Sequence, residues 1–202
     1  MVTKIRTPIV VQGEDSKEKL GLVHVYTGDG KGKTTASLGL ALRAIGNNLK
    51  VYMIQFLKSG FTGELYSSKK LGFTIEQFGV DALKEKQIRL QEFADKTGRF
   101  VFQPDIEEKA AAMQALEHAK KMIKSNDYDL IILDEINCAL DKGLIPLDDV
   151  LNLVKDHGKV ELVLTGRDAP KEVMDAADYV SVVNRVKHPW QKGIKARRGI
   201  EY

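Results

Sequence analysis

The chain has 202 residues, a length that suits one α/β domain with a sizeable core. Its 31 basic and 28 acidic residues leave a net charge of +3, too small an excess to indicate nucleic-acid binding. A single cysteine, Cys138, excludes an internal disulfide framework. No apolar run is long enough for a membrane span, and the N-terminus lacks the apolar core of a secretion signal. We therefore expect a cytoplasmic protein with no nucleic-acid or membrane partner.

The predicted elements begin after residues 1–20, whose proline, glycine and charged run indicate a flexible arm or a lid. Residues 57–72 contain three glycines and read as a break, residues 79–104 as irregular with a short helix around 82–94, and residues 185–202 as an irregular basic tail. Elsewhere the patterns predict strands at 22–26, 51–56, 73–78, 128–133, 160–165 and 179–184, and helices at 33–46, 105–124, 147–154 and 170–177. This alternation predicts one α/β domain over 21–202, with a mostly parallel sheet flanked by helices.

A glycine-rich segment, Thr27-Gly-Asp-Gly-Lys-Gly-Lys-Thr-Thr35, lies between the first predicted strand and helix. Gly28, Gly30 and Gly32 allow backbone N–H groups to approach a polyphosphate, Lys33 can reach its oxygens, and the Thr34 hydroxyl can hold Mg²⁺. The following helix adds the positive end of its dipole. The usual phosphate-loop spacing places glycine at position 27, where this chain has Thr27. We therefore predict a variant phosphate-binding loop; a glycine-rich turn without ligand is the alternative.

Two acids, Asp134 and Glu135, follow an apolar strand and resemble the carboxylate that holds the metal in phosphate-loop enzymes. Either can bind Mg²⁺ directly or through water; a strand cap or a surface ion pair is the alternative. Arg167 ends the next strand and is predicted to reach the same sheet edge, where it can pair with phosphate or form a structural salt bridge. For Arg43, a helix-surface ion pair and a ligand contact are equally plausible. Cys138 is predicted to be a small buried residue rather than a nucleophile.

Further motifs resemble one enzyme family. They are Val25-Tyr-Thr-Gly-Asp-Gly-Lys-Gly-Lys-Thr-Thr-Ala36, Gly39-Leu-Ala-Leu-Arg43, Ile54-Gln-Phe-Leu-Lys58, Leu133-Asp-Glu-Ile-Asn137, Leu164-Thr-Gly-Arg167, Lys187-His-Pro189, Gly193-Ile-Lys-Ala196 and Gly199-Ile-Glu201. In this order they resemble the P-loop class of ATP:corrinoid adenosyltransferase, also called cob(I)alamin adenosyltransferase. The resemblance covers roughly residues 21–202, and its C-terminal part discriminates best from other P-loop enzymes. It implies a P-loop NTPase fold of the RecA-like type.

The resemblance also implies the chemistry. These enzymes move the 5′-deoxyadenosyl group of ATP onto the cobalt of a reduced corrinoid, cobalamin or cobinamide; Co(I) attacks the ribose C5′ and triphosphate leaves. The triphosphate lies in the loop in the reverse of its usual direction, with which Thr27 is compatible. The family precedent is a homodimer, and the need for Co(I) suggests a flavoprotein reductase as a partner. A P-loop ATPase or small-molecule kinase with another acceptor is the alternative, and a non-catalytic binding protein is a third reading.

Carried over to this sequence, the resemblance implies four overlapping groups of site residues. Thr27, Gly28, Gly30, Lys31, Gly32, Lys33, Thr34 and Thr35 belong to the triphosphate loop, and Thr34 and Glu135, with Asp134 nearby, hold Mg²⁺ or Mn²⁺. Lys33, Arg167 and Glu135 are the catalytic candidates. Arg43, Glu64, Lys187 and His188 are expected near ATP or the corrinoid.

The chain departs from the family at two places. Asp29 stands where members often have Asn, which adds negative charge beside the phosphates. Members often carry Gly-Phe-Thr-Trp before the long helix, a segment that displaces the axial ligand of the corrinoid. The corresponding segment here, Gly98-Arg-Phe-Val-Phe102, has no Trp, so the expected apolar face falls to Phe100 and Phe102, with core aromatics as the alternative reading.

Overall fold

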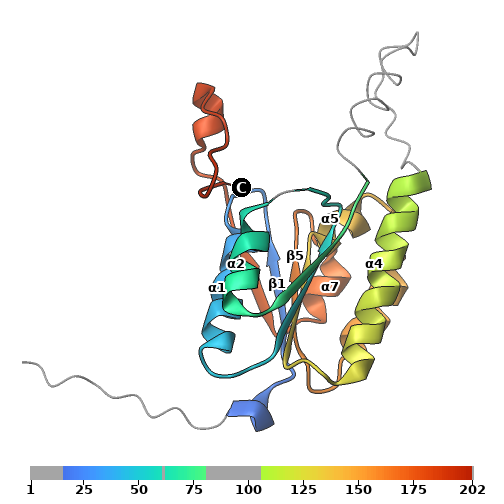
Figure 1. Cartoon of the computed structure of the whole chain (residues 1–202). Coiled ribbons are helices and arrows are strands. Elements are labelled where there is room, and N and C mark those ends of the chain that lie inside the picture. The colour runs from blue at the N-terminus through green and yellow to red at the C-terminus, as the bar shows by residue number, and fades with distance from the viewer. Residues whose placement is uncertain (1–15, 61, 81–105, 202) are drawn as a thin grey trace, which may run out of the picture.

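The computed structural model describes residues 16–60, 62–80 and 106–201. In this part of the chain, six strands form a single sheet in the order β3-β2-β4-β5-β1-β6, and every neighbouring pair is parallel. The strands are β1 (Val23–Thr27), β2 (Val51–Phe56), β3 (Thr74–Phe78), β4 (Leu130–Asp134), β5 (Glu161–Thr165) and β6 (Tyr179–Val182). The predicted α/β fold with a parallel sheet is thereby confirmed (Figure 1).

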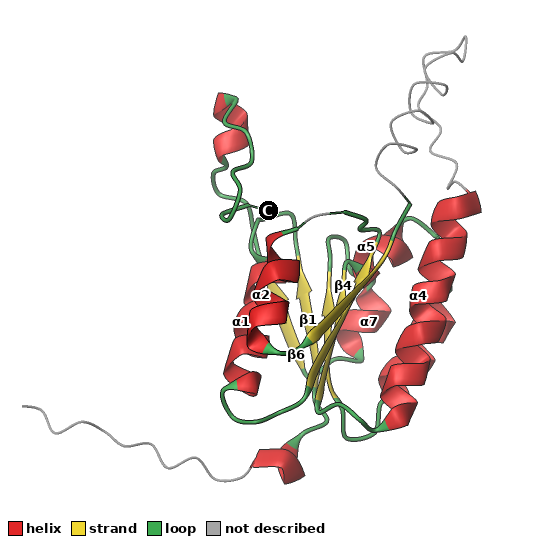
Figure 2. Ribbon diagram, viewed as in Figure 1, coloured by secondary structure: helices red, strands yellow, loops and turns green. Residues whose placement is uncertain are grey.

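Helices cover both faces of the sheet (Figure 2). The α-helices are α1 (Lys33–Ile45), α2 (Gly63–Leu71), α4 (Ile106–Ser125), α5 (Ile136–Asp141), α6 (Leu147–Lys155) and α7 (Lys171–Asp175). Two short 3₁₀ turns, Ser16–Lys19 and Pro189–Lys192, lie before β1 and in the tail. Helices α1 and α2 lie on one face, and α4, α5, α6 and α7 lie on the other. None of the helices in the described ranges is long and apolar enough to cross a bilayer.

The central strand β4 explains why the core has two halves. All five of its residues are buried, and consecutive side chains point to opposite faces. Ile131 and Leu133 pack with α4, α5 and α6, whereas Leu130 and Ile132 pack with Ala41 of α1. A parallel strand covered on both faces is expected to be an almost continuous apolar run, which is how this segment reads in the sequence.

Two helices were not predicted. Residues 57–72 read as a glycine-rich break, but Gly63–Leu71 forms α2, whose single buried residue is the polar Ser68. A helix without an apolar stripe gives no periodic signal, and α2 ends at Gly72 in the left-handed conformation (φ 75°). The short helix α5 follows Glu135 directly and is too brief for periodicity to reveal. The short helix expected around 82–94 lies outside the described residues.

Candidate active site

The glycine-rich loop packs tightly against the chain that follows β6. Gly28 has φ 98°, and a Cβ at this position would lie 2.5 Å from the carbonyl oxygen of Val183. The N–H of Gly30 donates to the same oxygen at 2.7 Å, and a Cβ on Gly30 would also lie 2.7 Å from it. Both positions therefore require glycine because no side chain fits between the loop and Val183. The chain that directly follows β6 consequently helps to hold the loop in place.

Lys33 begins α1, and its side chain folds back over the loop. It is only 8% exposed, and its ammonium donates to the carbonyl oxygens of Gly28 at 2.6 Å and Gly30 at 2.8 Å. Burial lowers the pKa of Lys33, an effect that nearby Glu135 opposes. Because an ammonium has three N–H donors, these two bonds hold Lys33 in place and leave a third donor for an anion in the loop.

A cavity of about 600 Å³ lies over the loop. Its wall joins the loop and the start of α1 to the ends of β4 and β5 and to the tail: Asp29, Gly30, Lys31, Gly32, Lys33, Thr34, Thr35, Glu135, Arg167, Arg185, His188, Ala196, Ile200 and Glu201. Most of the predicted site residues thus meet around one space, although they come from four separate parts of the sequence. Its cations and loop N–H groups suit a polyphosphate.

A second cavity of about 630 Å³ adjoins the first, because both share Thr34, Thr35, Ile200 and Glu201. Its other walls come from α1, from α2 with the chain before it, and from Phe73. Leu38, Leu42, Leu71 and Phe73 make much of this wall apolar, and Lys58 and Glu64 bring charge to it. The two spaces therefore lie side by side, and the first is more cationic while the second is more apolar.

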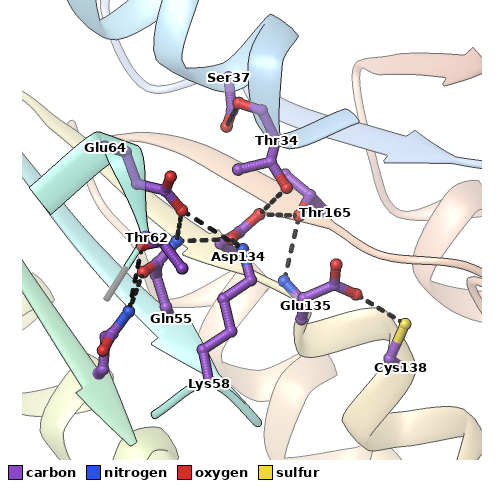
Figure 3. A network of polar contacts seen from close by, with 11 residues as sticks. Thr34, Ser37, Gln55, Lys58, Thr62, Glu64, Asp134, Glu135, Cys138 and Thr165 are labelled. Atoms are coloured by element: carbon purple, nitrogen blue, oxygen red, sulfur yellow. Dashed lines mark hydrogen bonds and ion pairs between the residues drawn. The ribbon is translucent and has the colours of Figure 1, made fainter. Parts of the chain in front are cut away.

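Asp134 and Glu135 are neighbours in the chain at the end of β4, and their side chains lie in different environments (Figure 3). Asp134 is fully buried, and its Oδ1 accepts hydrogen bonds from Thr34 at 2.8 Å and Thr165 at 2.6 Å. Glu135 is half-buried and lies on the wall of the first cavity. Its backbone is left-handed (φ 64°, ψ 15°), a conformation that costs a non-glycine residue about 1–3 kcal/mol. The strained residue is thus a carboxylate on the cavity wall.

The Cys138 thiol is hydrogen-bonded rather than free to react. Its sulfur donates to Glu135 Oε2 at 2.8 Å and accepts the backbone N–H of Arg167 at 3.2 Å. Burial first, and Glu135 second, raise the pKa of Cys138 to about 12, so the thiol stays protonated near neutral pH. This agrees with the prediction that Cys138 is not a nucleophile.

The extra negative charge at Asp29 is balanced locally. Its carboxylate accepts the backbone N–H of Arg185 at 3.0 Å, and the Arg185 guanidinium lies 3.4 Å from its other oxygen. These contacts lower the pKa of Asp29, with the backbone hydrogen bond as the largest cause. Arg185 therefore offsets the departure from the family pattern and adds a cation to the first cavity.

Several predicted residues lie apart from the cavity over the loop. Arg43 is exposed in the last turn of α1 and lines a separate cavity of about 240 Å³. This cavity lies beside the first residues of β4 and β5, whereas the phosphate loop lies at the carboxyl ends of the strands. Lys187 is exposed in the tail, while its neighbour His188 reaches the first cavity. Phe100 and Phe102 lie outside the described residues.

Thr27 has a structural partner beneath the loop. Its side chain is buried, and its hydroxyl accepts the backbone N–H of Ala169 at 3.1 Å. We expect Thr27→Val to reduce the free energy of unfolding by about 1–3 kcal/mol, because this buried N–H would lose its acceptor. Urea unfolding measures the change, and Thr74→Val on the exposed start of β3 is the matched control. Unchanged stability with weakened ATP binding would instead place the Thr27 hydroxyl on the phosphates.

Sequence reasoning gave no role to three polar residues of the site, although two of them lie in the motif Ile54-Gln-Phe-Leu-Lys58. Gln55 lies inside the fully buried strand β2, Lys58 follows the end of that strand, and Arg185 follows β6. The available signals were a glutamine within an apolar run and a lysine just beyond its carboxyl end. Both Gln55 and Lys58 contact Asp134, as described below.

Comparison with known proteins shows the family to which the chain belongs. Residues 19–202 match the family model described as ATP:corrinoid adenosyltransferase BtuR/CobO/CobP. The chain is 31% identical over 200 residues to the corrinoid adenosyltransferase CobA of Salmonella typhimurium, covering 98% of this chain and 94% of the relative. It is 32% identical over 194 residues to a corrinoid adenosyltransferase of Escherichia coli, covering 96% and 90%. A corrinoid adenosyltransferase of Pseudomonas aeruginosa is 32% identical over 191 residues, covering 93% and 86%. With its parallel sheet, phosphate loop and paired acids, the chain belongs to the ATP:corrinoid adenosyltransferase family, which acts in cobalamin biosynthesis.

Proposed function

We propose that this chain binds the triphosphate of ATP in the cavity over the loop and the adenosyl group in the adjoining cavity, where a reduced corrinoid accepts it. The observation that carries this proposal is that the two cavities adjoin and share Thr34 and Thr35 in their walls. The first space gathers lysine, arginine and loop N–H groups, as triphosphate requires. The second cavity is more apolar, which suits a nucleoside, and Glu64 lies on its wall, where it can contact the nucleoside.

The reaction of the family needs no nucleophile from the protein. Co(I) attacks the ribose C5′, the C5′–O bond breaks, and the electron pair leaves with the triphosphate. In this reaction the corrinoid supplies the nucleophile and the protein stabilises the leaving group. The described residues suit that task because they offer cations for the triphosphate. We assign Lys33 and Arg167 to the triphosphate, where their charges counter the charge that develops as it leaves.

We also propose that Thr34 and Glu135 hold Mg²⁺ or Mn²⁺, with Asp134 behind them. A hydroxyl and a carboxylate are oxygen ligands of the kind these cations prefer. Within the part of the chain that the structure describes, no three His, Cys, Asp or Glu side chains gather as a ready-made cage. This fits Mg²⁺, which takes few protein ligands and completes its shell with phosphates and water. When bound, such an ion would neutralise charge on the triphosphate.

Anaerobic mixing of the protein with ATP, Mg²⁺ and borohydride-reduced cob(I)alamin tests the reaction. We expect the light-sensitive spectrum of adenosylcobalamin, together with triphosphate. ADP and phosphate without a spectral change would favour the alternative, a P-loop ATPase or kinase with another acceptor. Binding of ATP or corrinoid without turnover would indicate a carrier. Repeating the assay with cobinamide compares the two candidate corrinoids.

The remaining proposals concern assembly and the electron source. We propose a homodimer in the cytoplasm that receives electrons for Co(I) from a flavoprotein reductase. Tyr179, Val180 and Val182 of the edge strand β6 are all more than 40% exposed, and their apolar surface supports a contact between subunits. Sedimentation analysis across a range of protein concentrations tests the dimer. Adenosylation that starts from cob(II)alamin, with and without a reduced flavoprotein, tests the electron source.

A further inference from the structure

The Asp134 carboxylate has its hydrogen-bonding capacity filled by other side chains (Figure 3). Besides the two hydroxyls on Oδ1, its Oδ2 accepts from Gln55 Nε2 at 3.0 Å and from Lys58 Nζ at 2.6 Å. A carboxylate offers about four lone-pair positions, and here four donors use them. Asp134 is also fully buried. A metal ion could bind it only by displacing one of these partners.

Lys58 supplies the positive charge of this network. Its ammonium lies 2.6 Å from Asp134 and 3.7 Å from Glu64, and its side chain is 24% exposed on the wall of the second cavity. Burial would lower the pKa of Lys58, but the charge and hydrogen bond of Asp134, together with the charges of Glu64 and Glu135, raise it overall. The ammonium thus stays charged at neutral pH and cancels the charge of Asp134.

The surrounding chain holds Lys58 in this position. Leu57, which precedes it, is left-handed (φ 58°), and its N–H donates to the carbonyl of Phe78 at 2.9 Å. Gln55 Nε2 donates to Glu64 Oε1 at 2.8 Å as well as to Asp134. Hydrogen bonds and ion pairs around the Lys58 ammonium therefore connect the start of α2 with the ends of β2 and β4. So many constraints on a single lysine indicate a defined role.

We propose that Lys58 is a positioning residue that keeps Asp134 out of the metal's coordination shell and cancels its charge. This inference rests on the proposed metal site at Thr34 and Glu135. With the Lys58–Asp134 pair neutral, Glu135 is the carboxylate whose charge acts on the ion. The metal then depends on the phosphates of ATP for its other ligands, and it leaves with the triphosphate. Without Lys58, a second and uncompensated carboxylate would face the ion and hold it in the absence of nucleotide.

Mn²⁺ binding, measured from the electron paramagnetic resonance signal of the free ion, tests this inference. It is measured with and without ATP, and always without corrinoid, so that no transfer occurs. We expect Lys58→Met to tighten Mn²⁺ binding at least about tenfold and to create a site in the ATP-free protein, because a nearby positive charge is lost. Asp134→Asn should weaken binding at least about tenfold, because Lys58 is then unbalanced. The double variant should return to within about threefold of wild type, since the pair is removed as a unit.

Two further variants complete the design. Lys58→Arg keeps the charge and should retain affinity near wild type. Lys171→Met, which breaks an exposed ion pair with Asp175 on α7, is the matched control and should change nothing. Thermal melting of every variant separates metal effects from unfolding. Should Lys58→Met fail to fold, the comparison of Asp134→Asn with the double variant still decides the question.

The outcomes separate this inference from the proposal on which it rests. Wild-type protein with ATP that binds Mn²⁺ no better than ATP alone would overturn the metal site and the inference together. Normal wild-type binding, with a double variant as weak as Asp134→Asn, would overturn only the inference, because Asp134 would then be a metal ligand. Unchanged or weaker binding by folded Lys58→Met would overturn it as well.

Discussion

Replacing Lys33 by alanine will lower kcat/KM for ATP by about a hundredfold to a thousandfold. The side chain is 8% exposed and begins α1, where the loop, the helix end and the ammonium converge on one space. Alanine removes a charge-assisted contact to the leaving triphosphate, and in a preorganised site such a contact is worth about 3–4 kcal/mol. It also leaves the carbonyls of Gly28 and Gly30 without the donor that they have in this structure.

Steady-state adenosylation of cob(I)alamin measures this effect, and calorimetry with inorganic triphosphate measures the loss of binding separately. Lys171→Ala, at an exposed lysine of α7, is the matched control. A melting temperature near wild type shows that the fold survives. Activity close to wild type in Lys33→Ala would mean that the loop does not hold the phosphates, and the proposed placement of ATP would fail.

Replacing Glu135 by glutamine will lower kcat by about a hundredfold and raise the Mg²⁺ concentration needed for half-maximal activity. Glutamine has nearly the same shape, so it can keep the left-handed backbone at this position. What it loses is the carboxylate charge at the wall of the first cavity. Charge-assisted contacts are about twice as strong as neutral ones, and the neutral amide is a poorer ligand for a divalent cation.

The Mg²⁺ dependence of the initial rate, compared with that of Glu172→Gln on α7, gives the decisive measurement. Glu172 lies in the first turn of its helix and is exposed, so its loss should leave the metal requirement unchanged. If Glu135→Gln kept both the wild-type rate and the wild-type Mg²⁺ requirement, then Glu135 would not be a metal ligand. The strain at its backbone would then need another explanation.

Local sequence patterns were sufficient for most of the fold. Apolar runs predicted all six strands, although β4 starts and ends later than predicted and β6 ends sooner. The glycine-rich segment between β1 and α1 and the acids after β4 were recognisable because each phosphate-site motif lies within a few consecutive residues. Helices α2 and α5 were missed because α2 has no apolar stripe and α5, with six residues, is too short to show a period.

The sequence by itself determined where the six described strands and four of the six described α-helices lie along the chain, where the glycine-rich loop lies, and the family, because these depend on residues that are close together in the chain. Only the tertiary structure decided which distant residues meet. It brings Lys58 to Asp134 across 76 positions and Arg185 to Asp29 across 156. It also places Arg43 beside the amino ends of β4 and β5, away from the phosphate loop. The first two contacts depend on the strand order, in which β2 lies beside β4 and β6 lies beside β1. Strand order reflects the packing of the whole core, and no short stretch of sequence specifies it.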